Sequence, residues 1–199
     1  MRKNVHLLVA LCIGMASICL SGCYVRTQEI IKDNRFQSPS FHNDEIITVM
    51  ITDDGKYTFR YDTYDNFKGE SKNENIQKLY LGSGITVAHK VQAALLSIFS
   101  HVELLNTKNR EKAILLSKEQ NARFLIIPSI LHWEDRNTPW SGIADKIEIK
   151  IEIMDIATEK VVNSIIFRAH NEWATLTDQP PEDLLNGKFN EAIISLFNN

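Results

Sequence analysis

The densest group of residues that could do chemistry lies between positions 129 and 145. Tryptophan rings can form the walls of a ligand pocket, and a carboxylate beside a guanidinium can anchor a polar ligand or a partner protein. These residue types, with one tryptophan further along the chain, predict a candidate binding surface. Its members are Trp133, Asp135, Arg136, Trp140, Asp145 and Trp173.

A second interpretation of the same residues is architectural, and we favour it. The tryptophan rings would cover a sheet, while Asp135, Arg136 and Asp145 would fix a long connection between two strands. Hydrogen bonds between acids and arginine stabilise such a connection well because both partners are charged.

Catalytic and metal-binding patterns are missing from the sequence. No serine lies in a GxSxG motif and no HExxH motif occurs. Five histidines outside the first 22 residues lack the spacing of metal ligands. His132 and His170 could contact each other across a sheet, but we favour ordinary surface positions for them. We therefore expect no catalytic residue, no metal and no cofactor. The five are His42, His89, His101, His132 and His170.

Gly82-Ser83-Gly84 precedes an expected helix, and a helix N-terminus can bind an anion. The segment is neither a GxGxxG motif nor a P-loop. We favour a simple turn, with Ser83 near the helix cap.

The first 23 residues have the organisation of a secretory signal. Basic residues follow Met1, an uncharged apolar run spans 7–20, and the run closes on Leu20-Ser21-Gly22-Cys23. This run is shorter than the roughly 20 residues that a membrane-spanning helix needs. A cysteine thiolate is the nucleophile that an acyl group would modify.

Leu20-Ser21-Gly22-Cys23 resembles the lipobox of bacterial lipoproteins. The resemblance implies cleavage before Cys23, acylation of its thiol and attachment to the lipid bilayer. In enterobacterial lipoproteins an aspartate after the cysteine retains the protein at the inner membrane. Tyr24 stands there instead, which implies the periplasmic face of the outer membrane, with an inner-membrane anchor as the alternative.

Composition limits the remaining possibilities. Removal of 22 residues from the 199 would leave 177, enough for one domain with a substantial core. The net charge of −3 gives no basic surface for nucleic acid. Cys12 and Cys19 would leave with the signal and Cys23 would carry lipid, so the domain would hold no disulfide.

Hydrophobic periodicity predicts the elements. The run 46–51 is apolar on both faces and is expected to be a central strand, whereas 146–154 alternates isoleucine with charge. Pro128 indicates an edge or a bulge. Ala113, Leu115 and Leu116 are expected to face inward. The expected strands are 46–51, 56–61, 102–105, 123–131, 146–154 and 161–170, and the expected helices are 85–100, 108–120 and one that begins at Pro180.

The order of these elements predicts an α/β (α+β) fold. We expect a single mixed sheet with a long antiparallel hairpin and about three helices packed on it. The predicted organisation is a signal peptide over 1–22, a lipidated tether over 23–45, and one domain over 46–199, with a solvated loop or an insertion over 62–78.

Several motifs together resemble a family of bacterial lipoproteins, the domain of unknown function 4823. They comprise Leu81-Gly82-Ser83-Gly84, Trp133-Glu134-Asp135-Arg136, Trp140-Ser141-Gly142, Glu172-Trp173-Ala174-Thr175 and Pro181-Glu182-Asp183-Leu184-Leu185. The resemblance extends over roughly 46–187 and departs at the longer polar segment 62–78 and at Asp178-Gln179, where glycines are expected. The family brings no catalytic assignment to this sequence.

The expected function is a non-enzymatic, periplasm-facing interaction or envelope-assembly module with a periplasmic or envelope protein as partner. One alternative is a small-ligand or glycan-binding lipoprotein that uses the region of Trp133, Trp140 and Trp173. An unrecognised hydrolase is a third, less favoured possibility.

Overall fold

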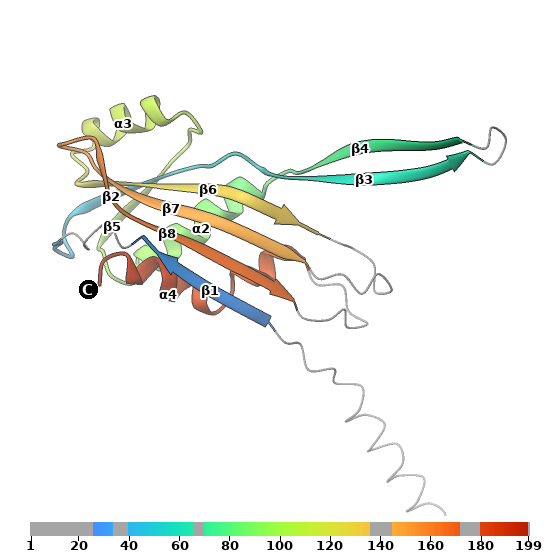
Figure 1. Ribbon diagram of the computed structural model, residues 1–199. Coiled ribbons are helices and arrows are strands. Elements are labelled where there is room, and N and C mark those ends of the chain that lie inside the picture. The colour runs from blue at the N-terminus through green and yellow to red at the C-terminus, as the bar shows by residue number, and fades with distance from the viewer. Residues whose placement is uncertain (1–25, 34–39, 66–69, 136–144, 172–179, 199) are drawn as a thin grey trace, which may run out of the picture.

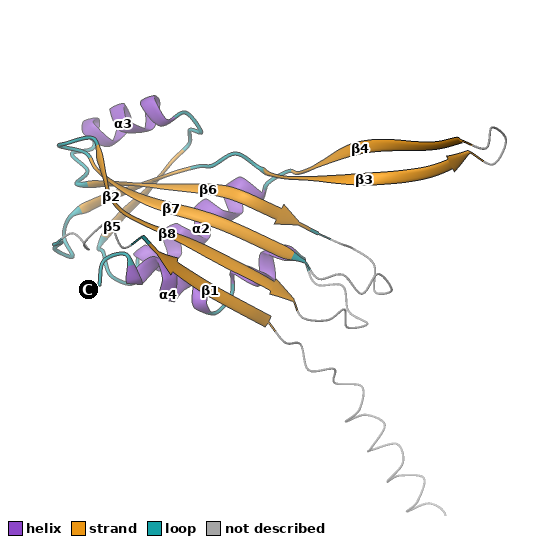
Figure 2. Cartoon of the chain, in the orientation of Figure 1, coloured by secondary structure: helices purple, strands orange, loops and turns teal. Residues whose placement is uncertain are grey.

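A computed structural model describes residues 26–33, 40–65, 70–135, 145–171 and 180–198. In this part of the chain, a six-stranded mixed sheet and a separate two-stranded hairpin combine with three α-helices and one short 3-10 helix (Figures 1 and 2). The predicted α+β class, with a mixed sheet and helices packed on it, is confirmed.

The strand order of the main sheet is β1-β8-β7-β6-β2-β5. β2 pairs in parallel with both β5 and β6, and the remaining ladders are antiparallel. β2 is therefore central to the parallel part, as predicted. The bounds are β1 (Arg26–Lys32), β2 (Ile46–Met50), β5 (His101–Leu105), β6 (Phe124–Glu134), β7 (Lys146–Asp155) and β8 (Lys160–Asn171).

One face of the sheet is covered by α2 (Ser83–Leu95), the 3-10 helix η1 (Pro181–Leu185) and α4 (Lys188–Ser195). The isoleucines at alternate positions of β7, from Ile147 to Ile153, are all 0% exposed on this face. Burial of each such side chain contributes about 1.5–3 kcal/mol relative to exposure. The predicted isoleucine face and the hairpin of β7 with β8 are both confirmed.

A smaller core lies on the opposite face, under α3 (Arg110–Glu119). Ala113 and Ser117 are 0% exposed and lie one turn apart, so they face the sheet, whereas Leu115 is 60% exposed. The inward position predicted for Leu115 is therefore wrong. Ser117 explains the difference, because its hydroxyl hydrogen-bonds the Thr48 hydroxyl at 2.7 Å and holds that turn of the helix against β2.

The tether predicted over 23–45 is wrong at Arg26–Lys32, which forms edge strand β1. Seven residues of β1 pair with β8, from Arg26 opposite Asn171 to Lys32 opposite Ile165. Sequence reasoning missed β1 because its residues are mostly polar, as edge strands tolerate. The folded domain therefore begins well before residue 46.

The solvated loop predicted over 62–78 is also wrong. β3 (Gly55–Asp65) and β4 (Glu70–Tyr80) form one continuous antiparallel ladder, from Gly55 opposite Tyr80 to Asp65 opposite Glu70. Figure 1 shows this hairpin extending past the ends of β6, β7 and β8. Polar residues make the same backbone ladder as apolar ones, so composition did not reveal it.

Two smaller corrections concern proline and glycine. Pro128 lies beyond the part of β6 that pairs with β2, so the predicted edge is confirmed, while the bulge falls at Leu131. The last helix is divided into η1 and α4, because Gly187 adopts a φ of 86°, which ends one helical segment before the next begins.

Candidate functional site

Trp133, the first member of the predicted binding surface, is 0% exposed and lies in the core beneath the helices. Its Cβ lies so close to Gly55 that a side chain at Gly55 would overlap it. Trp133 is therefore an internal packing residue in this structure and does not line an open surface.

Asp135 and Asp145 both fix the ends of strands. The Asp135 backbone N–H donates to the Tyr80 hydroxyl at 3.1 Å, and its carboxylate lies 3.5 Å from Lys78 Nζ. Asp145 is 8% exposed and accepts a hydrogen bond from the Asn171 side chain at 3.3 Å. Both residues therefore have the anchoring contacts that the architectural interpretation describes.

Arg136, Trp140 and Trp173 lie outside the described residues. The binding surface predicted for them stays a prediction. The structure does bring the other three members to one end of the sheet, because Glu134 at the end of β6 lies opposite Lys146 at the start of β7.

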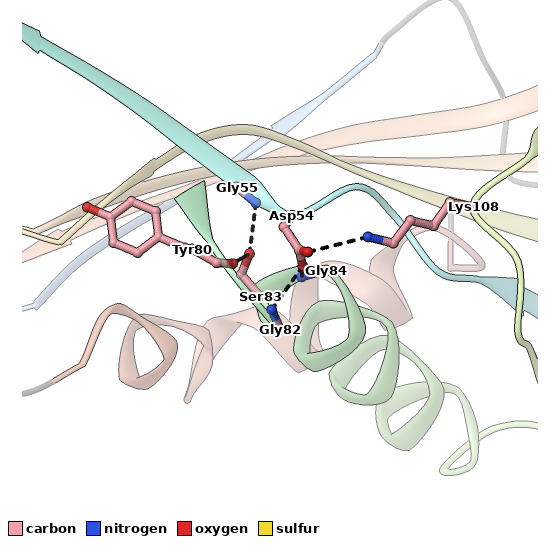
Figure 3. A network of polar contacts seen from close by, with 7 residues as sticks. All are labelled: Asp54, Gly55, Tyr80, Gly82, Ser83, Gly84 and Lys108. Atoms are coloured by element: carbon pink, nitrogen blue, oxygen red, sulfur yellow. Dashed lines mark hydrogen bonds and ion pairs between the residues drawn. The ribbon is translucent and has the colours of Figure 1, made fainter. Parts of the chain in front are cut away.

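A polar network that sequence reasoning missed joins the β3–β4 hairpin to the N-terminus of α2 (Figure 3). We name it the hairpin joint; it comprises Asp54, Gly55, Tyr80, Gly82, Ser83, Gly84 and Lys108. It lies at the carboxyl end of β2, the strand between the two parallel neighbours, where α/β sheets commonly place ligands.

Asp54 occupies the N-terminus of α2. Its Oδ1 accepts the backbone N–H groups of Gly82 at 3.1 Å and Gly84 at 3.0 Å, while Oδ2 lies 3.4 Å from Lys108 Nζ. Burial opposes ionisation of Asp54, but the Gly84 N–H, the Lys108 ammonium and the Gly82 N–H outweigh it and lower the pKa of Asp54.

An internal carboxylate thus fills the anion-binding position that Gly82-Ser83-Gly84 offered. Gly82 is the N-cap, and Ser83 is the first helical residue. The Ser83 hydroxyl accepts from the Gly55 N–H at 2.8 Å and donates to the Tyr80 carbonyl at 2.7 Å, which ties both hairpin strands to the helix. The favoured turn interpretation agrees with this geometry, although Ser83 serves the hairpin and makes no cap hydrogen bond.

The sheet face opposite α2 and α4 carries a row of charges across four strands. Glu29 on β1 lies opposite Arg168 on β8, which lies opposite Glu148 on β7, and Glu148 lies opposite His132 on β6. Arg168 Nε is 3.1 Å from Glu148, and this carboxylate, together with Glu29 on the opposite side of Arg168, raises the pKa of Arg168. Glu29, Arg168 and Glu148 therefore alternate in sign along three neighbouring strands.

The histidines do not assemble a metal site in the described part of the chain. His132 Nε2 lies 2.9 Å from Glu134, and its ring packs edge-on against Tyr57. His170 is on β8, separated from β6 by β7. Among the described residues, no group of three or more histidine, cysteine, aspartate or glutamate side chains is placed to bind a metal ion.

None of the described helices is long and apolar enough to cross a membrane.

A family model, the domain of unknown function (DUF4823), matches residues 69–196. The match extends over more than half of the chain, so this protein belongs to that family. Comparison with curated protein sequences finds no match.

Among solved structures, the fold is similar to the PelC dodecamer from Paraburkholderia phytofirmans, with a TM-score of 0.55, 12% identity, and coverage of 86% of this chain and 94% of that chain. A second structure, the dodecamer of a PelC variant with one substitution from the same organism, gives a TM-score of 0.56 at 12% identity, with coverage of 86% and 98%. At this identity the similarity concerns the fold alone.

Proposed function

We propose that this protein is a membrane-anchored, periplasm-facing lipoprotein that acts as a non-enzymatic interaction or envelope-assembly module. The observation that carries the proposal is Leu20-Ser21-Gly22-Cys23 at the end of a signal-like segment. β1 begins only three residues after Cys23, so a folded domain would follow the acylated residue almost directly. Two or more acyl chains would anchor it stably, whereas one would bind only marginally.

The site geometry is consistent with a module that offers surfaces. In the hairpin joint the charged groups of Asp54 and Lys108 pair with each other. On the charged sheet face Arg168 pairs with Glu148, and Lys150 pairs with Glu152. These contacts position elements of the fold. Tyr24, where an aspartate would favour the inner membrane, supports the outer membrane as the location.

Self-association is part of the proposal. Both PelC structures are dodecamers, and they share the fold over 86% of this chain. Light scattering on the domain from residue 24 onward should give a mass several times that of one chain. A monomer across the whole concentration range would contradict self-association while leaving the lipid anchor untouched.

Acylation is tested by metabolic labelling with radioactive palmitate. Cys23→Ser should abolish labelling and release the domain from membranes, because no thiol remains at the modified position. Cys19→Ser is the matched control: it removes a thiol inside the signal and should keep the label. Continued labelling of Cys23→Ser would contradict the proposal.

Location and partner need separate measurements. Membrane fractionation of the wild type should find it with the outer membrane, and recovery with the inner membrane would remove the argument from Tyr24. Crosslinking in cells, compared between wild type and Arg136→Ala, should capture an envelope protein that the variant loses. Equal capture by both would exclude Arg136 from the interface.

A further inference from the structure

The sheet face opposite α2 and α4 holds two isoleucines outside both cores. Ile31 on β1 lies directly opposite Ile166 on β8, and both side chains are partly exposed. Their neighbours in the chain point the other way: Ile30 packs against the larger core, and Phe167 is 0% exposed within it. Among the described residues, neither core includes Ile31 or Ile166. An apolar pair therefore remains at the surface of this face.

Charged side chains border the isoleucine pair on the same face. Glu29 lies opposite Arg168 on one side of it, and Lys150 lies opposite Ile166 on the neighbouring strand. Figure 1 shows β1, β8 and β7 side by side, whereas α3 packs against β2 and β6, toward the other edge of the sheet. An apolar centre within a polar rim is the usual organisation of a protein interface. We name the surface formed by Glu29, Ile31, Ile166 and Arg168 the open face.

Arg168 has donors left for a second carboxylate. Its Nε lies 3.1 Å from one oxygen of Glu148, and a terminal nitrogen donates to the other oxygen at 3.2 Å. These contacts use two of the five N–H donors of the guanidinium. The side chain of Arg168 is 42% exposed, and Glu29 opposite it is also exposed. A guanidinium and a carboxylate thus lie next to each other at the surface, on neighbouring strands.

The open face is complementary to itself. A two-fold rotation about an axis parallel to the strands keeps the strand direction and reverses the strand order across the sheet. An axis between β1 and β8 therefore places Glu29 of each copy against Arg168 of the other copy. The same rotation places Ile31 of each copy against Ile166 of the other. Sheets that pack face to face keep their strand directions within about 30° of each other, which agrees with this rotation.

The position of the acylated cysteine selects the direction of the axis. The chain from Cys23 to Arg26, where β1 begins, spans at most about 11 Å. β1 is about 20 Å long, so this segment is too short to turn back along the strand. Because the rotation keeps the strand direction, both copies begin β1 at the same end, and both acyl groups enter one bilayer. An axis across the strands would point them to opposite ends.

We infer that the open face is a contact between two copies of this chain, related by a two-fold axis parallel to the strands. The inference rests on the proposed acylation and self-association, and it names the surface that self-association uses. The partner is a second copy because opposite charges and apolar side chains of the same surface meet under one rotation. Charge complementarity across the contact fixes its register, since like charges that face each other are strongly unfavourable.

The test uses two copies of the lipidated full chain that carry different affinity tags, expressed together and solubilised from membranes in detergent. Purification of wild type by one tag should recover the copy with the other tag. Arg168→Glu in both copies leaves only carboxylates at the contact, and it should reduce the recovery by about tenfold or more. Glu29→Arg in both copies should reduce it similarly, because only guanidinium groups then meet. Lys118→Glu on α3, at a side chain of similar exposure, is the matched control and should leave the recovery unchanged.

One copy with Arg168→Glu, expressed with one copy with Glu29→Arg, should restore most of the recovery. Each carboxylate of the first copy then meets a guanidinium of the second at both positions. Restoration also excludes misfolding as the cause of the losses, because the restored pair contains both substitutions.

Three results would contradict the inference in distinguishable ways. Undiminished recovery with Arg168→Glu, where wild-type copies associate, would overturn the contact at the open face and leave self-association intact. Loss with each variant alone, without restoration in the mixed pair, would also overturn it, because positions 29 and 168 would not then face each other. Failure of wild-type copies to purify together would instead remove the proposed self-association and the inference with it.

Discussion

Adjacent residues of β8 face opposite sides of the sheet. Phe167 is 0% exposed and its ring packs edge-on against Phe189 of α4 at 5.0 Å, whereas the side chain of Arg168 is 42% exposed beside Glu148. The covered face, under α2 and α4, is a continuous apolar layer, while the other face carries paired charges outside the smaller core under α3. The difference indicates that stability resides on the covered face and that the charged face is available for contacts.

The largest expected effect breaks the covered face. Phe167→Ala removes a fully buried ring and should lower the free energy of unfolding by about 3–5 kcal/mol, because a cavity is left under α4. Arg168→Ala, one residue away, should change it far less, since an exposed ion pair is screened by solvent. Urea unfolding of both variants measures the two values. Similar losses would contradict the division between the faces.

A second prediction concerns the place where the first turn of α2 lies against the backbone that follows β2. A side chain at Gly84 would overlap the Thr52 carbonyl oxygen, which is backbone and cannot move aside. Gly84→Ala should therefore destabilise the protein by about 1–3 kcal/mol. Thermal unfolding measures the loss. Thr86→Ala, on the same helix turn, is the control: alanine has a higher helix propensity than glycine or threonine, so propensity opposes a loss, and an equal loss at Thr86 would contradict the steric explanation.

A third prediction concerns the face that α3 shares with the charged row. The Thr48 and Ser117 hydroxyls form the 2.7 Å bond there, and Ser117 also donates to the Ala113 carbonyl at 2.8 Å. Thr48→Val should cost about 1 kcal/mol, the usual net value of one hydrogen bond. Thr48→Val combined with Ser117→Ala should cost less than the sum of the single variants. Strict additivity in urea unfolding would mean that the bond contributes nothing.

Sequence patterns predicted the covered face well because local spacing determines it. Isoleucines at alternate positions of β7 place all their side chains on one face of the strand, which must be buried. The apolar side chains of α2 likewise lie along one side of the helix, which must pack against the sheet. The same patterns predicted the start of β3, as the strand 56–61, but not β1 or the rest of the β3–β4 hairpin over 62–78. Both are polar, and β1 is defined by pairing with β8, far away in the chain.

The hairpin joint was equally inaccessible from the sequence. Asp53-Asp54-Gly55 reads as a turn, and nothing local indicates that Asp54 meets Lys108, 54 positions later. The sequence predicted that Gly82 and Gly84 precede a helix, but it did not predict that their N–H groups bind Asp54. Trp133 shows the converse: its residue type suggested a ligand contact, and packing against Gly55 determined that it is buried.

The smallest predicted effect tests whether charge at the joint contributes beyond its hydrogen bonds. Asp54→Asn keeps an acceptor for the Gly82 and Gly84 N–H groups and removes the charge beside Lys108, so at pH 7 it should cost about 0.5–1 kcal/mol. Because the pKa of Asp54 is lowered in the fold, its charge stabilises the protein fully above the unfolded value of about 3.9 and is lost as pH falls through the folded value.

Urea unfolding of wild type and Asp54→Asn at several pH values should therefore give a constant difference from pH 7 to about pH 5, which disappears as the pH falls below about 4. Asp53→Asn removes the same charge at an exposed neighbouring position and should change the free energy of unfolding less at pH 7. A difference for Asp54→Asn that persisted unchanged at pH 3 would assign its effect to lost hydrogen bonds. The hairpin joint would then be stabilised by its hydrogen bonds alone. Stabilisation by paired charges would be confined to the sheet face that carries Arg168 and Glu148.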